Sequence, residues 1–237
     1  MSSINIIDNS NDLSNNLMYQ NSSLNCGNWF ENKLNIPYYS MKDSRWSDLR
    51  YFDIAGTYYK VEESASSYVA LAMILSGLNQ DLTINPKTII EFILGEKDTN
   101  NDQILDTYYL DRNLDGVCDA NDSLSQNCSN GSLRKSALLS RDIALEYSVS
   151  IVETGKSLLE IQQKIDSFYS VLVKIPGHYF VITSSNEEYT ENGELHYKMV
   201  VLDPFFSYRN GIYTMEEFEN KICYGSVSYA IAYKSRL

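Results

Sequence analysis

Three polar residues of this chain, Ser66, His178 and Asp203, are of the types that serve as a nucleophile, a general base and the carboxylate that orients the base. His178 begins a predicted strand, Asp203 ends a later one, and Asn192-Gly193 between them predicts a tight hairpin turn. Because a hairpin sets its two strands side by side, we expect His178 and Asp203 to meet at one end of a sheet. Most such pairs are structural, so this one indicates a candidate site and does not by itself establish an enzyme.

Ser66 lies near the start of an apolar segment, residues 63–78, which predicts a helix. Serines come first, an unbroken apolar run follows, and Gly77 is predicted to end the helix. A helix that is apolar on nearly all sides belongs in the middle of a domain. Its first turn offers unpaired backbone N–H groups and the positive end of the dipole, which stabilise a thiolate or an oxyanion. Ser66 therefore has two interpretations, as a nucleophile or as the N-cap of the helix.

The rest of the chain predicts helices first and strands last. Residues 86–94 predict a short helix opened by a proline. Residues 132–147 have helical spacing, and residues 157–168 predict a helix whose Ser157 and Glu160 form a capping box. The later predicted elements are strands at 171–175, 178–183 and 197–202, a short helix at 215–222 and a final strand at 226–233. This order predicts an α+β fold with an antiparallel sheet.

Length and charge limit the classes of function. A chain of 237 residues, 43% of them hydrophobic, suits one domain with an insertion. Residues 1–33, rich in Asn and Ser, predict a flexible lead, and residues 34–237 the domain. The net charge of −12 argues against nucleic acid or an anionic membrane as a partner. No apolar run approaches the roughly 20 residues that span a bilayer, so we expect no membrane insertion.

Residues 96–130 predict an acidic insertion, because residues 98–122 hold seven Asp and one Arg, a net charge of −6. Within it, Asp111 begins a twelve-residue segment with Gly116 at its sixth position. Oxygen-bearing side chains stand at positions 1, 3, 5, 9 and 12 of this segment, and position 7 would contribute a backbone carbonyl: Asp111, Asn113, Asp115, Asp119, Asp122 and Val117. This is the pattern of an EF-hand-type calcium loop. With Asp122 in place of the usual Glu, the segment resembles the calcium loops of dockerin modules.

A second copy of the pattern begins 13 residues earlier. Its oxygens stand at positions 1, 3, 5 and 9, which are Asp98, Asn100, Asp102 and Asp106. Gln103 replaces the glycine and Tyr109 the last ligand, so this site would be weaker or would borrow Asp111. The other interpretation is a solvated acidic loop. We expect calcium in a structural role, and loops of millimolar-range affinity favour an extracellular or cell-surface location.

Four short motifs follow one another in a recognisable order. The chain contains Ile36-Pro-Tyr-Tyr-Ser-Met-Lys-Asp-Ser-Arg-Trp46, then Glu63-Ser-Ala-Ser-Ser-Tyr68, then Gly177-His178 before an apolar strand, and finally Asp203-Pro204. Over about residues 34–235 this order resembles the papain-like cysteine peptidases of the bacteriocin-processing (double-glycine leader) family. The resemblance implies a papain-like fold, with N-terminal helices packed on a C-terminal antiparallel sheet.

Two departures from the family pattern concern the chemistry. Ser66 stands where the family has its nucleophilic Cys, and Met41 stands where it has the Gln that donates to the oxyanion. The neighbours Ala65, Ser67 and Tyr68 also differ, so the change is wider than a single Cys→Ser substitution. The resemblance therefore implies a degenerate peptidase that acts as a calcium-stabilised binding or scaffold module, with a peptide or protein ligand.

Two alternatives remain open. One is an active hydrolase that uses Ser66, His178 and Asp203 as a triad. The other is a thiol enzyme in which Cys26 enters the cleft. Both alternatives predict a covalent adduct with a suitable reagent, whereas a binding module predicts none.

Overall fold

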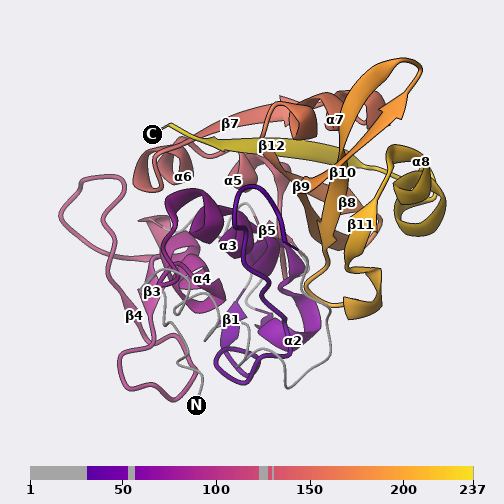
Figure 1. Ribbon diagram of the computed structural model, residues 1–237. Helices are drawn as coiled ribbons and strands as arrows, with labels where there is room; N and C mark the ends of the chain where they lie inside the picture. Colours follow the sequence, from indigo (N-terminus) through magenta and orange to yellow (C-terminus); the bar gives the residue numbers. More distant parts are fainter. Residues whose placement is uncertain (1–30, 53–56, 123–127, 130, 237) are drawn as a thin grey trace, which may run out of the picture.

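A computed structural model of the chain describes residues 31–52, 57–122, 128–129 and 131–236. In these residues, N-terminal helices pack against a six-stranded antiparallel sheet from the C-terminal half of the chain (Figure 1). The predicted α+β class is thus confirmed. Residues 1–30 of the predicted lead lie outside the described residues. Asn32, near the end of that lead, is buried and forms an antiparallel bridge with Ser185.

The elements follow one another along the chain in this order. They are β1 (Arg50–Phe52), β2 (Tyr58–Lys60), α2 (Val61–Ser64), α3 (Ser66–Asn79), α4 (Pro86–Leu94), β3 (Glu96–Lys97), β4 (Thr107–Tyr108), η2 (Ala120–Asp122), β5 (Cys128–Ser129), β6 (Ser132–Leu133), α5 (Lys135–Leu138), α6 (Arg141–Glu146), β7 (Val149–Thr154), α7 (Leu158–Asp166), β8 (Ser170–Ile175), β9 (His178–Glu191), β10 (Glu194–Leu202), η4 (Ser207–Arg209), β11 (Gly211–Tyr213), α8 (Met215–Phe218), the π-helical turn η5 (Glu219–Cys223) and β12 (Tyr229–Ser235).

Both faces of the large sheet, of strand order β11-β10-β9-β8-β12-β7, are covered. On β8, Leu172 belongs to the cluster that contains α3, whereas Val171 and Val173 belong to a second cluster with residues of α7 and α8. Strand side chains alternate between faces. A strand buried on both faces therefore reads as a continuous apolar run, as Tyr179-Phe-Val-Ile182 of β9 does.

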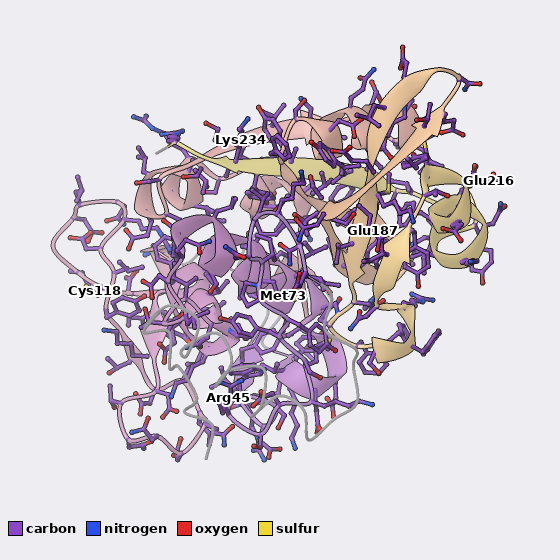
Figure 2. All side chains as sticks on the ribbon, in the orientation of Figure 1. Arg45, Met73, Cys118, Glu187, Glu216 and Lys234 are labelled. Carbon is purple, nitrogen blue, oxygen red and sulfur yellow. The ribbon has the colours of Figure 1, made fainter. Side chains whose placement is uncertain are left out.

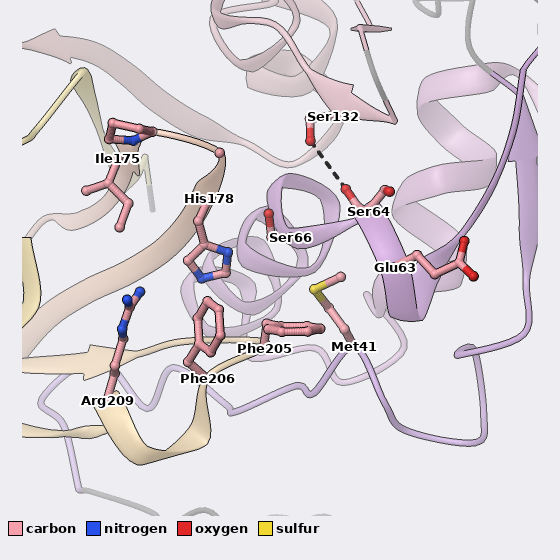
Figure 3. A pocket seen from close by; sticks show the side chains of 12 residues that line it. Met41, Glu63, Ser64, Ser66, Ser132, Ile175, His178, Phe205, Phe206 and Arg209 are labelled. Atoms are coloured by element: carbon pink, nitrogen blue, oxygen red, sulfur yellow. Dashed lines mark hydrogen bonds between the residues drawn. The ribbon is translucent and has the colours of Figure 1, made fainter.

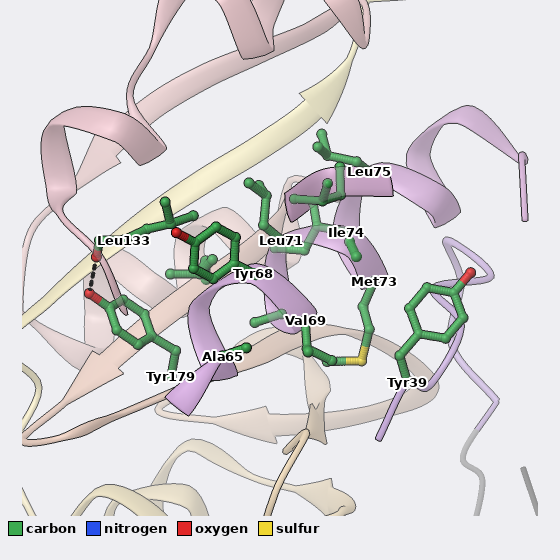
Figure 4. Packing of buried hydrophobic residues seen from close by; sticks show 14 of the residues in the cluster. Tyr39, Ala65, Tyr68, Val69, Leu71, Met73, Ile74, Leu75, Leu133 and Tyr179 are labelled. Carbon is green, nitrogen blue, oxygen red and sulfur yellow. Dashed lines mark hydrogen bonds between the residues drawn. The ribbon is translucent and has the colours of Figure 1, made fainter. Parts of the chain in front are cut away.

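Helix α3 lies in the middle of the first cluster. Its residues from Ser66 to Gly77 are all buried, and Figure 4 shows apolar side chains leaving it in several directions. The predicted stop at Gly77 is wrong, because α3 continues to Asn79 and ends at Gln80 in the left-handed conformation, with φ of 52°. Gly77 is instead a packing position, since a Cβ there would lie 2.7 Å from the Cα of Ile36.

Several local predictions need correction. The predicted capping box of α7 is wrong: Ser157 is the N-cap but makes no side-chain cap bond, and the Glu160 side chain lies beside Gly155. The helical spacing of residues 132–147 corresponds to β6 followed by two short helices, α5 and α6. Strands β7 and β11 were not predicted, although they form the two edges of the large sheet.

The acidic insertion is attached to α4 by two cations. The Lys87 ammonium of α4 lies 2.7 Å from Asp98, near the start of the insertion. The Arg112 guanidinium, near its middle, donates to the carbonyls of Phe92 and Ile93 in the last turn of α4. A guanidinium at this end of a helix satisfies carbonyls that have no partner in the helix.

Figure 2 shows Met73 inside the molecule and Cys118 on the outer loops of the insertion. Cys118 is exposed and forms no disulfide. None of the helices within the described ranges is long and apolar enough to cross a membrane.

Because Gly77 packs closely on Ile36, we expect its replacement by alanine to destabilise the protein. Alanine in place of a helical glycine normally stabilises a protein, by roughly 0.5–1 kcal/mol. Here Gly77→Ala forces a methyl group against the Ile36 backbone, so we expect a loss of about 1–3 kcal/mol in the free energy of unfolding, measured by urea denaturation. The control is Gln163→Ala on the exposed face of α7, expected to change stability by less than about 0.5 kcal/mol. A Gly77→Ala protein as stable as the parent would contradict this packing.

Candidate functional site

His178 and Asp203 meet at one end of the sheet, as predicted. His178 is the first residue of β9, Asp203 follows the end of β10, and the register of the hairpin pairs Val181 with Leu202. The predicted turn between the strands has positive φ at both Asn192 and Gly193. His178 Nε2 lies 2.8 Å from Asp203 Oδ1.

The Asp203 carboxylate is completely buried and receives several donors. Its Oδ1 also accepts the backbone N–H groups of Phe205 and Phe206, at 2.9 and 2.8 Å, and the Arg209 guanidinium lies 3.5 Å from Oδ2. Buried charge is tolerated when it is paired and hydrogen-bonded in this way. Because a carboxylate accepts, His178 Nε2 is the donor in this contact, which leaves Nδ1 as the ring nitrogen that is turned away from Asp203.

Ser66 is the first residue of α3, and its interpretation as the N-cap is wrong. The N-cap is Ala65, which has no side-chain acceptor, and Val69 is the first residue to donate within the helix, to the Ala65 carbonyl at 3.0 Å. The Ser66 hydroxyl has no hydrogen-bond partner among the described residues. In Figure 3 it lies on the side of the His178 ring that faces the helix.

Ser66 and His178 share one cleft, of about 420 Å³. The residues that line it are Met41, Glu63, Ser64, Ser66, Ser132, Ile175, Pro176, Gly177, His178, Phe205, Phe206 and Arg209. Met41, which stands at the position expected for the oxyanion donor, is on the wall of the cleft and is only 2% exposed. Its thioether has no hydrogen to donate. Its backbone N–H already donates to the Pro204 carbonyl, at 2.9 Å.

An aromatic wall beside His178 was not predicted from the sequence. The ring of Phe206 meets the imidazole edge to face, at 5.2 Å between centroids, and Phe205 packs on Phe206 at 4.7 Å. The Arg209 guanidinium lies 4.5 Å from the Phe206 ring centroid. The signal available was the run of aromatic residues directly after Asp203-Pro204, because a turn that holds the carboxylate must also bring these side chains to the cleft.

The two acidic segments fold in the same way at their first seven positions. In the second, Asp111 accepts the N–H groups of Asp115 and Gly116, at 3.2 and 2.9 Å, and Asp115 accepts that of Val117, at 2.9 Å. Asn113 Oδ1 also accepts from the Asp115 N–H, at 2.9 Å. Positions 1, 3 and 5 therefore place their oxygens around one loop, as a calcium loop requires.

The first segment repeats these hydrogen bonds, and in addition its Asp98 pairs with the Lys87 ammonium of α4. Asp98 accepts the N–H groups of Asp102 and Gln103, at 3.1 and 3.2 Å, and Asn100 accepts that of Asp102, at 2.9 Å. Gln103 adopts the positive φ of the missing glycine, 65°. Burial opposes ionisation of Asp98, but the Lys87 ammonium and the backbone donors together lower its pKa. Asp106 bonds to Thr99, at 3.0 Å.

The fit of these loops to a metal is partial. Within the described part of the chain, no three His, Cys, Asp or Glu side chains gather closely enough to hold a metal ion. The position-9 residue of the second loop, Asp119, bonds instead to Asn121, at 2.8 Å from the backbone N–H. The side chain of Asp122 lies outside the described residues. The first three ligand positions thus share one loop, whereas the Asp119 carboxylate would have to leave Asn121 to join a metal there.

Comparisons of the chain with protein-family models, curated proteins and solved structures found no match. The case for a function therefore rests on the cleft and on the loops themselves.

The geometry around His178 predicts the reactivity of a thiol placed beside it. In Ser66→Cys, the new sulfur would lie near an imidazole and in the first turn of α3, and both lower a thiol pKa. We expect iodoacetamide at pH 6.5 to modify this cysteine about tenfold faster than exposed Cys118, with peptide mass mapping as the measurement.

Cys118 serves as the reference thiol within each molecule, and Ser66→Cys combined with His178→Ala is the matched control, in which the rate advantage should disappear. Equal rates at both cysteines in Ser66→Cys would show that the imidazole does not reach position 66.

Proposed function

We propose that the chain is a catalytically degenerate papain-like domain whose cleft binds an extended peptide. One observation carries this proposal: an assembled His178–Asp203 pair faces an open cleft, but no hydrogen bond joins His178 to Ser66 and the Met41 wall offers no donor. The order of the parts supports the papain-like assignment. A buried helix begins at the cleft, a histidine begins a strand of the sheet, and a carboxylate at the end of the next strand orients its Nε2.

The chemistry of the two nucleophiles favours the loss of activity. A thiol with a pKa near 8.5 ionises readily beside a histidine, whereas a serine hydroxyl must lose its proton during the attack. Loss of a single oxyanion donor costs about 10²–10³ in rate. Position 66 has the less acidic nucleophile and position 41 has no side-chain donor, so both changes act in the same direction.

The cleft has the size and the lining of a binding site. Its volume of about 420 Å³ falls in the usual range for ligand sites, roughly 300–1,000 Å³. One wall is aromatic, formed by Phe205 and Phe206, and the other is the polar start of α3. The exposed turn at Pro176 and Gly177 borders the cleft with backbone. An extended peptide can use all three, with an apolar side chain on the rings and its backbone along the turn.

A serine hydrolase is the second candidate. It is favoured by the free Nδ1 of His178, which has no hydrogen bond among the described residues and belongs to the ring edge near Ser66. In that case Ser66 would attack, His178 would take its proton and Asp203 would hold the imidazole. Cys26, the third alternative, lies outside the described residues.

We further propose that calcium stabilises the acidic insertion at Asp111, Asn113 and Asp115, with the Val117 carbonyl, Asp119 and Asp122 completing the ligands. The support is the preformed arrangement of positions 1, 3 and 5 and the positive φ of Gly116, 86°. Calcium would offset the repulsion among these carboxylates. In the first segment, Asp98, Asn100, Asp102 and Asp106 form the weaker site, because the Lys87 ammonium already neutralises Asp98.

One experiment separates the two functions of the cleft. A degenerate peptide library is incubated with the protein, and mass spectrometry reads which peptides are retained and which are cut. We expect retention of intact peptides, lost in Ser132→Trp, which places an indole in the cleft, and preserved in Glu188→Trp on the exposed part of β9. Cleavage that depends on Ser66, or labelling of Ser66 by a fluorophosphonate, would establish the hydrolase. If peptides are neither retained nor cut, both functions are excluded.

The calcium proposal predicts a metal-dependent melting temperature. A ligand at 100 times its Kd stabilises the folded state by about 2.7 kcal/mol, so calcium chloride should raise Tm and a chelator should lower it. Asp115→Ala, which removes position 5 of the second loop, should abolish most of the difference. The matched variant Asp102→Ala, at position 5 of the first loop, should abolish less of it. A Tm that is the same with calcium, magnesium and chelator would contradict the proposal.

A further inference from the structure

A second hollow, of about 510 Å³, adjoins the cleft. The two share Ser132 and Gly177 in their linings, so a ligand in one can continue into the other. Its remaining walls come from the residues before and within α5 and from β8, β9 and β12. Figure 3 shows Ser132, the shared residue, bonded to the Ser64 carbonyl at the edge of the cleft.

The hollow is cationic in an acidic protein. Arg134, Lys135 and Lys174 line it, and no Asp or Glu is among its lining residues. The whole chain, by contrast, has 31 Asp and Glu against 19 Lys and Arg. Lys135 forms an ion pair with Glu153, outside the hollow, while neither Arg134 nor Lys174 has an ion-pair partner among the described residues. The positive charges of Arg134 and Lys174 therefore have no carboxylate partner among the described residues.

Lys174 is the more constrained of these two cations. Its ammonium lies 3.9 Å from the centroid of the Tyr179 ring. Burial lowers the pKa of Lys174, and no neighbouring carboxylate counteracts that effect. The tyrosine hydroxyls of the hollow are already engaged. That of Tyr179 donates to the Leu133 carbonyl at 2.7 Å (Figure 4). It also pairs with the Tyr229 hydroxyl, at 2.7 Å. The side-chain donors of the hollow without a hydrogen-bonding or ion-pair partner among the described residues are thus those of Arg134 and Lys174.

We infer that this hollow binds the side-chain carboxylate of an acidic residue in the peptide that occupies the cleft. The inference rests on the proposed function, because it places one residue of that peptide. A carboxylate between Arg134 and Lys174 would replace the water lost on burial of Lys174 and would accept charge-assisted hydrogen bonds from both. The shared residues Ser132 and Gly177 then place the acidic residue next to the part of the peptide that crosses His178.

The test uses the peptides retained from the library. We expect Asp or Glu to be enriched at one position, and a retained peptide to bind about tenfold more weakly when that residue is replaced by Gln or Asn. Binding should also weaken at high salt, since charge pairing near a surface is screened. In Arg134→Met combined with Lys174→Met, the preference for the acidic residue should disappear while peptides are still retained. Lys198→Met, which removes a partly exposed cation of β10 that pairs with Glu187 of β9, is the control and should keep the preference.

The outcomes distinguish this inference from the function on which it rests. Retention with no acidic preference would overturn the inference and leave the peptide-binding cleft intact. If no peptide is retained, reductive methylation of Lys174 provides a direct test with N-acetylglutamate as the probe. Protection of Lys174 by N-acetylglutamate, but not by N-acetylglutamine, would support a carboxylate site, and absence of protection would overturn it. Protection by inorganic phosphate alone would also overturn it, as the mark of a site for free anions.

Discussion

The buried carboxylate of Asp203 is the constraint on which the site depends. A charge with no exposure to water must be paired and hydrogen-bonded, and Asp203 satisfies this with an imidazole, two backbone N–H groups and a guanidinium. Those donors come from two parts of the cleft, the start of β9 and the segment that follows Asp203. The histidine comes from the start of β9, and the turn after Asp203 carries Phe205 and Phe206 to the wall. Satisfying one charge therefore fixes the position of the histidine and of the aromatic wall together.

On the other side of the cleft, the hydrophobic core fixes the position of α3. Because α3 is buried along its length, the position of its first residue, Ser66, is determined by apolar contacts and by the close approach of Ile36 to Gly77. Strand β9, which begins with His178, packs against α3 on one face of the sheet and is covered on the other. The cleft thus lies between two well-packed parts, which together set the positions of Ser66 and His178.

The sequence predicted what depends on neighbours along the chain. The hairpin at Asn192-Gly193, the helix opened by Pro86 and the meeting of His178 with Asp203 all follow from short segments, and the structure confirms them. Two predictions about the ends of α3 were wrong, because they depend on features that the local residue types do not contain. Gly77 looked like a helix end because its partner, Ile36, is distant in sequence, and Ser66 looked like a cap because a backbone turn at Ala65 is invisible in residue types. The cationic hollow combines residues 134 and 174, a pairing that no local pattern contains.

The attachment of the acidic insertion to α4 has a consequence for how the protein tolerates breakage. Lys87 holds the insertion near its start, at Asp98, and Arg112 holds it again further on, by the carbonyls at the end of the same helix. A peptide bond cut between these two anchors would leave each half of the severed loop still tethered to the body. The insertion is therefore held to α4 at two points, and a single cleavage between them leaves both new chain ends attached to the domain.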